Sequence, residues 1–459
     1  MRDVAAIVLA AGKGTRFRSE RAKVLHRAAG RSLVGHVLEA LDPLGLGQVL
    51  VVVGHQSDAV SAEVTATGVG GCATVLQPEQ RGTGHAVQTA VPHLADGVRR
   101  VVVVPGDTPL LTTEWLRRLL EAGDDGGGAM LTAELEDPTG YGRVIRGGDG
   151  DVRGVVEERD ASDGQRRIRE INAGMYVFDR SVLDEVIAGL DDANAQGELY
   201  LTDVVARLAA DGRTVRATAA PADVVAGVND RAQLAEAAAV LRRRHLHRLM
   251  TEVGVTVTDP AATYVDVDVE VGADTELLPG TILEAGTRVG NGAVIGPDTH
   301  LTGCDVGDGA VVHSTRGDDA VIGAGANVGP FTHLRTGTRL GDRTRAGAFV
   351  ETKNAVVAEG SKVPHLAYLG DAVVGTGVNV SCGVVTVNYD GAVKSQTTIE
   401  DGAFVGCDTM LIAPVTVGAG AYTAAGSVIT DDVPADALAI ARSRQSVKEG
   451  WAARRREHG

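Results

Sequence analysis

A six-residue aliphatic repeat in the second half of the chain constrains the fold more than any other feature of the sequence. Aliphatic residues recur at every sixth position, often followed by glycine. One run comprises Val271, Leu277, Leu283, Val289, Ile295 and Leu301, and a later run comprises Val405, Leu411, Val417, Thr423 and Ile429. This period predicts a parallel β-helix in which each hexapeptide forms one face and its turn, with aliphatic side chains inside and glycine at the corners. The spacing alone predicts a solenoid and no chemistry.

The first half of the chain has a different pattern, in which short aliphatic runs alternate with amphipathic stretches. Expected strands cover residues 4–9, 48–53, 101–104, 129–133 and 174–178, and expected helices cover 32–41 and 113–121. This alternation predicts a mostly parallel sheet with helices on both faces. Such sheets bind ligands at the carboxyl ends of their strands.

A stretch rich in Ala, Leu and Arg joins the two halves. Residues 230–252 contain no Gly or Pro and predict one long helix that acts as a rigid connector. With 459 residues the chain is too long for one ordinary core. We therefore expect a first domain at 1–231, a linker helix at 232–252 and a β-helix domain at 253–459.

Charge and cysteine content argue against several classes of protein. The formal net charge of −16 disfavours a nucleic-acid or membrane-surface binder, since those need a basic face. No run reaches the ~18 apolar residues of a membrane span. The four cysteines are far apart and form no CxxC pair, which is typical of neither a disulfide framework nor a zinc site. We expect a cytoplasmic protein that binds neither nucleic acid nor membrane.

A glycine-rich turn follows the first expected strand. Its sequence, LAAGKGTR at residues 9–16, differs from both GxxxxGK[ST] and GxGxxG. Backbone N–H groups in such a turn approach a phosphate or a base edge, and Lys13, Arg16 and Lys23 supply charge. About half of such loops only make a tight turn, so the motif by itself is weak.

Two further segments favour nucleotide binding. A second Gly-Thr-Gly turn lies in QPEQRGTGHA at residues 77–86. Asp107 follows the most hydrophobic strand, at a place where a carboxylate holds Mg²⁺ beside a triphosphate. The alternative for Asp107 is a cap on the next element, in an Asp-Thr-Pro turn.

The β-helix half carries a dense group of polar residues that a stacked solenoid does not need. They are Arg335, Lys353, His365, Tyr368, Asn379, Asn388 and Tyr389. Isolated polar residues on the outer face of a solenoid are ordinary, and a lone histidine is more often a satisfied loop residue than a catalytic group.

These motifs resemble the bifunctional N-acetylglucosamine-1-phosphate uridylyltransferase/glucosamine-1-phosphate acetyltransferases, in order and over nearly the whole chain. The resemblance continues through residues 137–143, 156–157, 170–174, 198–203 and 227–229. It implies an α/β Rossmann-like nucleotidyltransferase domain, a long connecting helix and a left-handed β-helix of hexapeptide repeats. It also implies a homotrimer, with acetyl-transfer sites built from neighbouring subunits, and synthesis of UDP-N-acetylglucosamine for peptidoglycan and other envelope precursors.

For the uridylyltransferase half, the resemblance assigns residues to nucleotide, sugar and metal. Uracil would be read by Leu9, Ala10, Ala11, Gly12, Gln77, Gly82 and Thr83, and the phosphates of UTP would face Lys13 and the catalytic cations Arg16 and Lys23. Gly106 belongs to the same site, Gly142, Glu157 and Asn172 would hold the acetylated sugar, and Asp107 and Asn229 would coordinate Mg²⁺. An oxygen of N-acetylglucosamine 1-phosphate would attack the α-phosphorus of UTP in line, without a general base.

For the acetyltransferase half, the resemblance makes His365 the general base that frees the amine of glucosamine 1-phosphate for attack on acetyl-CoA. The sugar phosphate would contact Arg335, Lys353, Tyr368 and Asn379, and the acetyl donor would contact Asn388, Tyr389, Cys382, Cys407, Ala425 and Arg442. Cys382 and Cys407 depart from the family pattern on the coenzyme A path. They are either tolerated small residues, or they weaken coenzyme binding or act as oxidisable thiols.

Two other functions stay open at this point. In the first, the β-helix is only a structural or regulatory part of a uridylyltransferase. In the second, the chain is a non-catalytic solenoid with a nucleotide-sensing domain. The charged neighbours of His365 argue against the first alternative, and the pairing of Asp107 with Asn229 argues against the second.

Overall fold

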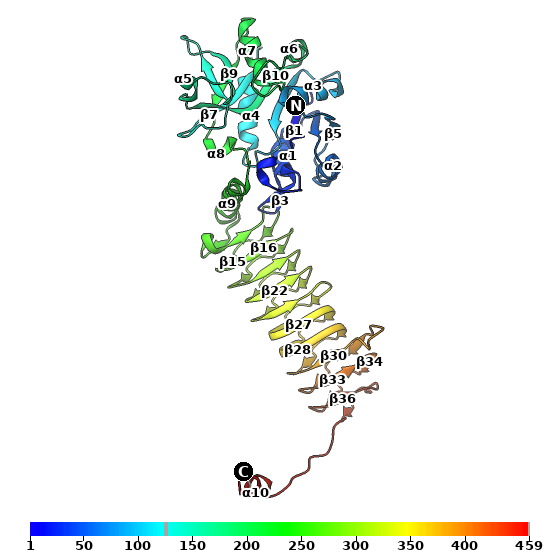
Figure 1. Cartoon of the computed structure of the whole chain (residues 1–459). Coiled ribbons are helices and arrows are strands. Elements are labelled where there is room, and N and C mark those ends of the chain that lie inside the picture. Colours follow the sequence, from blue (N-terminus) through cyan, green and yellow to red (C-terminus); the bar gives the residue numbers. More distant parts are fainter. Residues whose placement is uncertain (124–126, 458–459) are drawn as a thin grey trace. The chain divides into compact units, whose positions relative to one another are not determined.

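The structure is a computed structural model that describes residues 1–123 and 127–457 (Figure 1). The chain divides into two compact units, Met1–Leu241 and Arg242–Gly459. The division lies inside helix α9 (Arg231–Arg248), in the segment that the sequence predicts as a connecting helix. A π-helical turn at Leu249–Val253 ends this helix. Among the described residues, no helix has the length and apolarity that crossing a membrane requires.

A mixed sheet forms the centre of the first unit. Its main path is β11-β7-β10-β6-β1-β4-β5, and the strands β8 and β9 extend from β10. The bounds are β1 (Val4–Ala10), β4 (Gln48–Val53), β5 (Cys72–Leu76), β6 (Arg100–Pro105), β7 (Ala129–Glu134), β8 (Arg143–Arg146), β9 (Val152–Val156), β10 (Glu170–Asp179) and β11 (Arg216–Ala219), with a separate hairpin of β2 (Arg27–Ala28) and β3 (Arg31–Ser32). β1 is parallel to β4 and β6, whereas β10 is antiparallel to β6 and β7. The expectation of a mostly parallel sheet is wrong around β10, because this strand follows the β8–β9 hairpin instead of a parallel crossover.

Helices cover both faces of this sheet, with an aliphatic core on each side. The helices are α1 (Leu33–Leu41), α2 (Ser57–Ala66), α3 (Thr83–Ala90), α4 (Thr113–Ala122), α5 (Asp163–Arg166), α6 (Arg180–Ile187), α7 (Thr202–Ala210) and α8 (Ala222–Val225), with short 3-10 turns η1 (Thr15–Phe17), η2 (Lys23–Leu25), η3 (Asp42–Leu44) and η4 (Val91–His93). Along β1, Val4, Ala6 and Val8 belong to one core, and Ala5 and Ile7 belong to the other. This alternation follows from the two-residue period of a strand. A strand buried on both faces has a continuous aliphatic sequence, as β1 does.

The second unit is a parallel β-helix of stacked coils (Figure 1). Its strands are β12 (Thr256–Val257), β13 (Tyr264–Val265), β14 (Glu270–Val271), β15 (Glu276–Leu277), β16 (Ile282–Glu284), β17 (Arg288–Val289), β18 (Val294–Ile295), β19 (His300–Thr302), β20 (Asp305–Val306), β21 (Val311–Val312), β22 (Thr315–Asp318), β23 (Val321–Ile322), β24 (Asn327–Val328), β25 (Thr332–Leu334), β26 (Arg339–Leu340), β27 (Arg345–Val357), β28 (Lys362–Val374), β29 (Asn379–Val380), β30 (Val385–Val387), β31 (Thr397–Ile399), β32 (Phe404–Val405), β33 (Met410–Ile412), β34 (Val415–Val417), β35 (Tyr422–Thr423), β36 (Val428–Ile429) and β37 (Leu438–Ala439). Val271 pairs with Val289 and Leu283 pairs with Leu301, so three hexapeptides make one coil. The predicted solenoid is confirmed.

The corners of the coils are not always glycine. Several corners instead have a non-glycine residue with positive φ, including Asp274, Ala285, Asp298, Asp319 and Asp408. The sequence expectation of glycine at the corners is wrong at these positions. Aspartate is among the residues that enter the left-handed region most readily, which accounts for most of these exceptions.

Two segments of the second unit depart from the coil pattern. Residues 388–396 form a loop between β30 and β31 that interrupts the hexapeptide period. After β37, an exposed segment leads to helix α10 (Trp451–Glu457), which has no buried residue. A 3-10 turn, η6 (Pro260–Ala262), lies in the first coil.

Candidate active sites

A cavity of about 960 Å³ lies at the carboxyl ends of β1, β5 and β6. Strand ends are where open α/β sheets bind ligands, and this volume is typical of sites for small molecules and cofactors. The sequence-predicted residues that line it are Leu9, Ala10, Ala11, Gly12, Lys13, Arg16, Lys23, Gln77, Gly82, Thr83, Asp107, Gly142, Glu157, Asn172 and Asn229. Gly106 does not line the cavity; its N–H donates to the Leu9 carbonyl at 2.9 Å.

Gly14 lets the glycine-rich turn fold against the segment that carries Lys23. Its φ is +58°, and a Cβ at this position would lie 2.6 Å from the Lys23 Cβ. The turn continues into Phe17, which is buried and stacks on His26 with ring centroids 4.5 Å apart. These contacts hold the segments of Arg16 and Lys23 together at the cavity.

Two cationic side chains meet the predicted metal ligands. The Lys23 ammonium forms an ion pair with the Asp107 carboxylate and donates to Asn229 Oδ1 at 3.1 Å. Arg16 Nη2 donates to the same Asn229 oxygen at 2.8 Å. The two loops are tied together, because the Val228 N–H donates to the Asp107 carbonyl at 2.9 Å. The Asp107 and Asn229 side chains therefore converge on a cation.

This donor set fits a magnesium ion. Mg²⁺ prefers oxygen ligands and usually binds through one or two carboxylates, substrate phosphates and waters. The Lys23 ammonium lies between a carboxylate and an amide oxygen, so these oxygens already favour positive charge at that point. Within residues 1–123 and 127–457, no group of three or more His, Cys, Asp or Glu side chains could hold a metal. A metal here would depend on phosphate and water for its other ligands.

Gln233 is a site residue that the sequence did not reveal. Its Oε1 accepts a hydrogen bond from the Asn229 N–H at 2.7 Å, and Asn229 Nδ2 donates to the Gly227 carbonyl at 3.2 Å. These two bonds leave Asn229 Oδ1 for the cations in the cavity. No sequence motif identifies Gln233, because its contact with Asn229 arises only when the first turn of α9 forms.

The second Gly-Thr-Gly turn is anchored by its backbone. Gly82 has a φ of +103°, and a Cβ there would lie 2.6 Å from the Leu199 carbonyl oxygen. Gln77 is buried, and its Nε2 donates to the Gly82 carbonyl at 3.3 Å and lies 3.0 Å from His85 Nδ1. Gln77, Gly82 and Thr83 thus form a fixed wall of the cavity.

A half-buried carboxylate, that of Glu157, lines another part of the cavity. A Cβ on Gly142 would lie 3.4 Å from Glu157 Oε1, and the Asn172 N–H donates to the Gly142 carbonyl at 2.8 Å. Burial raises the pKa of Glu157, and the hydrogen bond that Thr202 Oγ1 donates at 3.3 Å offsets part of this rise. With one protein donor in place, the carboxylate keeps lone pairs that can accept ligand hydroxyl groups.

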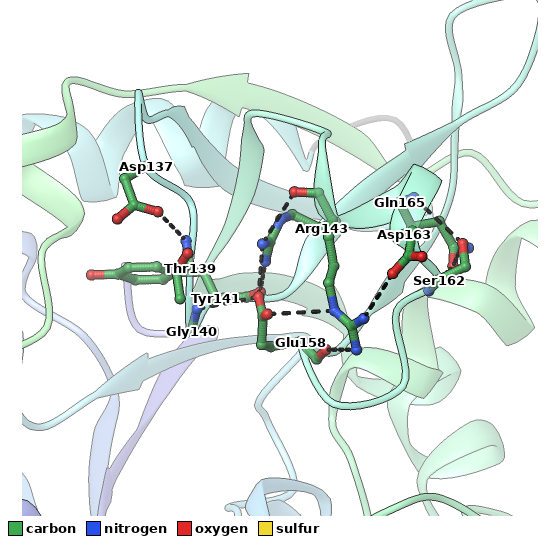
Figure 2. A network of polar contacts seen from close by, with 10 residues as sticks. Asp137, Thr139, Gly140, Tyr141, Arg143, Glu158, Ser162, Asp163 and Gln165 are labelled. Carbon is green, nitrogen blue, oxygen red and sulfur yellow. Dashed lines mark hydrogen bonds and ion pairs between the residues drawn. The ribbon is translucent and has the colours of Figure 1, made fainter.

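The loop that carries Gly142 is held from behind by an ion pair (Figure 2). Arg143 is 1% exposed, and its Nη2 contacts Glu158 Oε2 at 2.7 Å while its Nη1 donates to the Tyr141 carbonyl. Glu158 Oε2 also accepts from the Gly140 N–H at 3.2 Å. Gly140 and Tyr141 line the cavity, whereas Arg143 and Glu158 do not. The pair therefore fixes the backbone of the loop that lines the cavity, although neither side chain lines the cavity itself.

The resemblance predicts that this loop binds the sugar phosphate, so we expect Glu158→Gln and Arg143→Met to raise the KM for that substrate by about tenfold or more. We expect much less effect on kcat and on the KM for the nucleotide, which the resemblance assigns to other walls of the cavity. The physical reason is that the loop loses its fixed backbone while the phosphate-binding residues keep theirs. Steady-state kinetics with each substrate varied in turn measures this split. Arg146→Met, which breaks an exposed pair with Glu170, is the matched control. Equal changes in all constants would contradict a positioning role.

On the β-helix, four predicted residues form one outward column, which we call the corner column: His365, Cys382, Cys407 and Ala425. One ladder of paired strand residues runs through Lys362, Asn379, Phe404 and Tyr422. Each residue of the corner column lies three positions after one member of this ladder. The ladder continues at the corner, where the Asp408 N–H donates to the Cys382 carbonyl and the Gly426 N–H donates to the Cys407 carbonyl, both at 2.8 Å. Residues far apart in the sequence thus lie on successive coils.

A cluster of positive charge lies on the β-helix near residues predicted to bind phosphate. Lys394 and Arg335 lower the pKa of Lys353, because like charges nearby disfavour its protonated form. Arg335 Nη1 also contacts Glu351 Oε1 at 2.8 Å. Three cations with two carboxylates, Glu351 and Asp371, leave a net positive charge that favours an anionic ligand. Lys394 comes from the loop 388–396 and was not evident from the sequence, because the hexapeptide period is lost there.

Of the remaining predicted residues, Asn388 and Tyr389 lie beside this cluster. Asp371 accepts hydrogen bonds from Asn388 Nδ2 and from Asn354 Nδ2. Tyr389 is exposed, and its backbone forms an antiparallel β-bridge with that of Lys394. The hydroxyl of Tyr368 crowds Gly370, where a Cβ would lie 2.4 Å from it, and Asn379 Nδ2 donates to Ser381 Oγ at 3.2 Å. Arg442 is exposed, and its Cδ lies 3.9 Å from the place of a Cβ on Gly426, next to Ala425.

Comparison with known proteins decides the family. Residues 6–198 match the MobA-like NTP transferase domain. Over 465 aligned residues the chain is 50% identical to the bifunctional protein GlmU of Mycolicibacterium vanbaalenii, covering 99% of this chain and 94% of that protein. The chain belongs to the GlmU family. The GlmU proteins of Corynebacterium efficiens and Exiguobacterium sibiricum are each 49% identical to it, covering 98% and 97% of this chain and 94% and 99% of those proteins.

Membership of the GlmU family confirms the resemblance predicted from the sequence. The chain is a bifunctional enzyme, a nucleotidyltransferase and an acetyltransferase of UDP-N-acetylglucosamine synthesis. The GlmU proteins match both the first unit and the β-helix, so a β-helix that is only a scaffold is not favoured. A non-catalytic nucleotide sensor is not favoured for the same reason.

Proposed function

We propose that the cavity of the first unit carries uridylyl transfer and that the corner column of the β-helix carries acetyl transfer. In this assignment the β-helix site acetylates glucosamine 1-phosphate with acetyl-CoA. The cavity then joins the product, N-acetylglucosamine 1-phosphate, to UMP from UTP. The convergence of the Asp107 and Asn229 oxygens on the Lys23 ammonium is the observation that carries this proposal.

In the cavity, the reaction needs charge and orientation more than proton transfer. An oxygen of the sugar 1-phosphate is already anionic, so it attacks the α-phosphorus of UTP while the bond to the β-phosphate oxygen breaks and pyrophosphate leaves. Lys13, Arg16 and Lys23 offset the charge of the two polyanions and hold them in line. Asp107 and Asn229 would hold Mg²⁺, which supplies further positive charge beside the phosphates.

The walls of the cavity select the two substrates. The backbone of Leu9 to Gly12, with Gln77, Gly82 and Thr83, lines the cavity and would read the uracil edge. Gly142, Glu157 and Asn172, which also line it, would bind the acetylated sugar. Since Glu157 is largely removed from solvent, its hydrogen bonds to sugar hydroxyl groups would be stronger than they are in water.

In the β-helix, a proton must leave before the acetyl group can transfer. His365 accepts a proton from the ammonium group of glucosamine 1-phosphate, and the neutral amine attacks the thioester carbonyl. The C–S bond breaks, and the coenzyme A thiolate takes a proton. Arg335 and Lys353 bind the sugar phosphate, and Lys394 supports them. Tyr368 and Asn379 contact the sugar, Asn388 and Tyr389 contact the acetyl group, and Cys382, Cys407, Ala425 and Arg442 border the coenzyme.

We also propose a cytoplasmic homotrimer that supplies precursors of peptidoglycan and other envelope polymers. Phe331 and Phe349 support association of copies, because they stack with ring centroids 5.3 Å apart although both side chains are exposed. Exposed apolar patches of this kind mark interaction sites. Sedimentation equilibrium measures the number of copies.

A two-step assay of the purified protein tests the proposed function. With glucosamine 1-phosphate, acetyl-CoA, UTP and Mg²⁺, we expect release of coenzyme A thiol first and of pyrophosphate afterwards. Pyrophosphate should also appear when N-acetylglucosamine 1-phosphate replaces the first two substrates. Pyrophosphate without any thiol release would leave the β-helix as a scaffold, and thiol without pyrophosphate would refute the assignment of the cavity.

A further inference from the structure

Cys382 and Cys407 are direct neighbours in the corner column, although 25 positions separate them in the sequence. Asn379 pairs with Phe404 and Val380 pairs with Val405, which places both cysteines at the same point of adjacent coils. Backbone hydrogen bonds on both sides fix this register, from Ser381 N–H to the Val405 carbonyl at 2.9 Å and from Asp408 N–H to the Cys382 carbonyl at 2.8 Å. The β-helix itself therefore holds the backbones of the two cysteines at adjacent positions.

The spacing of adjacent coils suits a disulfide. Neighbouring strands lie about 4.8 Å apart, and the Cα atoms of a disulfide are usually about 4.4–6.8 Å apart. Cys407 is exposed and Cys382 is half-buried, and both are free thiols. Solvent therefore reaches Cys407 fully and Cys382 in part.

The other two cysteines lie in different compact units, Cys72 in the first and Cys304 in the second. Burial raises the pKa of Cys72 and of Cys304 to about 11, so few of these thiols are ionised at neutral pH. Cys304 lies in the closed interior of the β-helix. Cys72 and Cys304 serve as internal references for any reaction of Cys382 and Cys407.

We propose that Cys382 and Cys407 form a reversible disulfide by exchange with low-molecular-weight disulfides, and that this disulfide stops acetyl transfer while uridylyl transfer continues. The effect on acetyl transfer rests on the function proposed above. His365 occupies the same column on the coil before Cys382, so a cross-link there alters the surface beside the proposed base. The cavity of the first unit contains none of these residues.

The exchange balances in two steps. The Cys407 thiolate attacks one sulfur of the small disulfide, and the other sulfur leaves as a thiolate that takes the proton lost by Cys407. The Cys382 thiolate then attacks Cys407 Sγ in the mixed disulfide and releases the second small thiol, which takes the Cys382 proton. Two protein thiols are oxidised, and one small disulfide is reduced to two thiols.

Oxidised glutathione is the probe for the test on the full-length protein. We expect treatment to reduce acetyl transfer tenfold or more, to leave uridylyl transfer unchanged, and to give a peptide in which Cys382 and Cys407 are cross-linked by mass spectrometry. Dithiothreitol should restore the lost activity. Cys382→Ser and Cys407→Ser, each compared with its own reduced activity, should retain at most one glutathione adduct and no cross-link.

Mixed disulfides alone in the wild-type protein, or equal inhibition of uridylyl transfer, would overturn the proposal. Loss of acetyl transfer that persists in the Cys407→Ser variant would overturn it as well. Absence of acetyl transfer in the reduced wild-type protein would refute the proposed function instead, and the peptide mass would still decide whether the cross-link forms.

Discussion

Asp107→Asn is expected to reduce uridylyl transfer about 10³-fold and to leave acetyl transfer unchanged, because the interactions lost in the cavity contribute several kcal/mol to the transition state. Asp107 supplies the negative charge that pairs with Lys23 and that a metal ion requires. An amide of the same size keeps the shape of the side chain but removes that charge. The acetyltransferase residues lie in the other compact unit, so they should not respond.

Two measurements separate a loss of metal binding from a loss of folding. We expect the Asp107→Asn variant to lose most of its binding of Mn²⁺ in the presence of UTP, measured by electron paramagnetic resonance. Asp230→Asn is the matched control, because it removes one negative charge next to Asn229 from a side chain that does not line the cavity. Full Mn²⁺ binding by the Asp107 variant, or loss of both transfer activities, would contradict the assignment of this site.

His365→Ala is expected to reduce acetyl transfer and to leave uridylyl transfer intact. General acid–base catalysis contributes about 10²–10⁴-fold, so acetyl transfer should fall by that factor while uridylyl transfer is unchanged. The side chain is exposed and outside the hydrophobic core, and its removal therefore should not destabilise the β-helix. Coupled measurement of thiol release and pyrophosphate release on the same preparation checks both parts.

Chemical rescue distinguishes a base from a residue that only shapes the surface. Added imidazole should restore part of the acetyl transfer of His365→Ala and should not stimulate the wild-type enzyme. His333→Ala is the matched control, since His333 lies on the same β-helix and contacts Asp318 at 3.3 Å. A normal rate for His365→Ala would refute the proposed base, and a loss in both variants would point to structural damage.

The sequence predicted the repeating part of the β-helix well, because burial imposes a period that can be counted. It could not predict which outward residues meet. His365, Cys382, Cys407 and Ala425 share a corner, yet the intervals between them differ, since the loop 388–396 adds residues to one coil. Only the strand register shows that they are neighbours.

In the first unit, nearly all of the residues that the resemblance assigned to the uridylyltransferase site line the cavity, whereas local patterns missed the residues that support it. Arg143 looks like a surface residue by type, but its burial is tolerated because Glu158 pairs with its charge and the Tyr141 carbonyl accepts a hydrogen bond from its Nη1. The direction of β10 was also missed, because a strand's aliphatic pattern is the same whether its neighbours are parallel or antiparallel.

Stacking of coils has a consequence for how this half of the enzyme responds to heat. Each coil forms hydrogen bonds only with the coil before it and the coil after it, so its stability depends on nearest neighbours. The final coil, with β37, has a partner on one side only. Melting should therefore start at that end and proceed coil by coil, detaching Ala425 and Arg442 before it reaches the turn that carries His365.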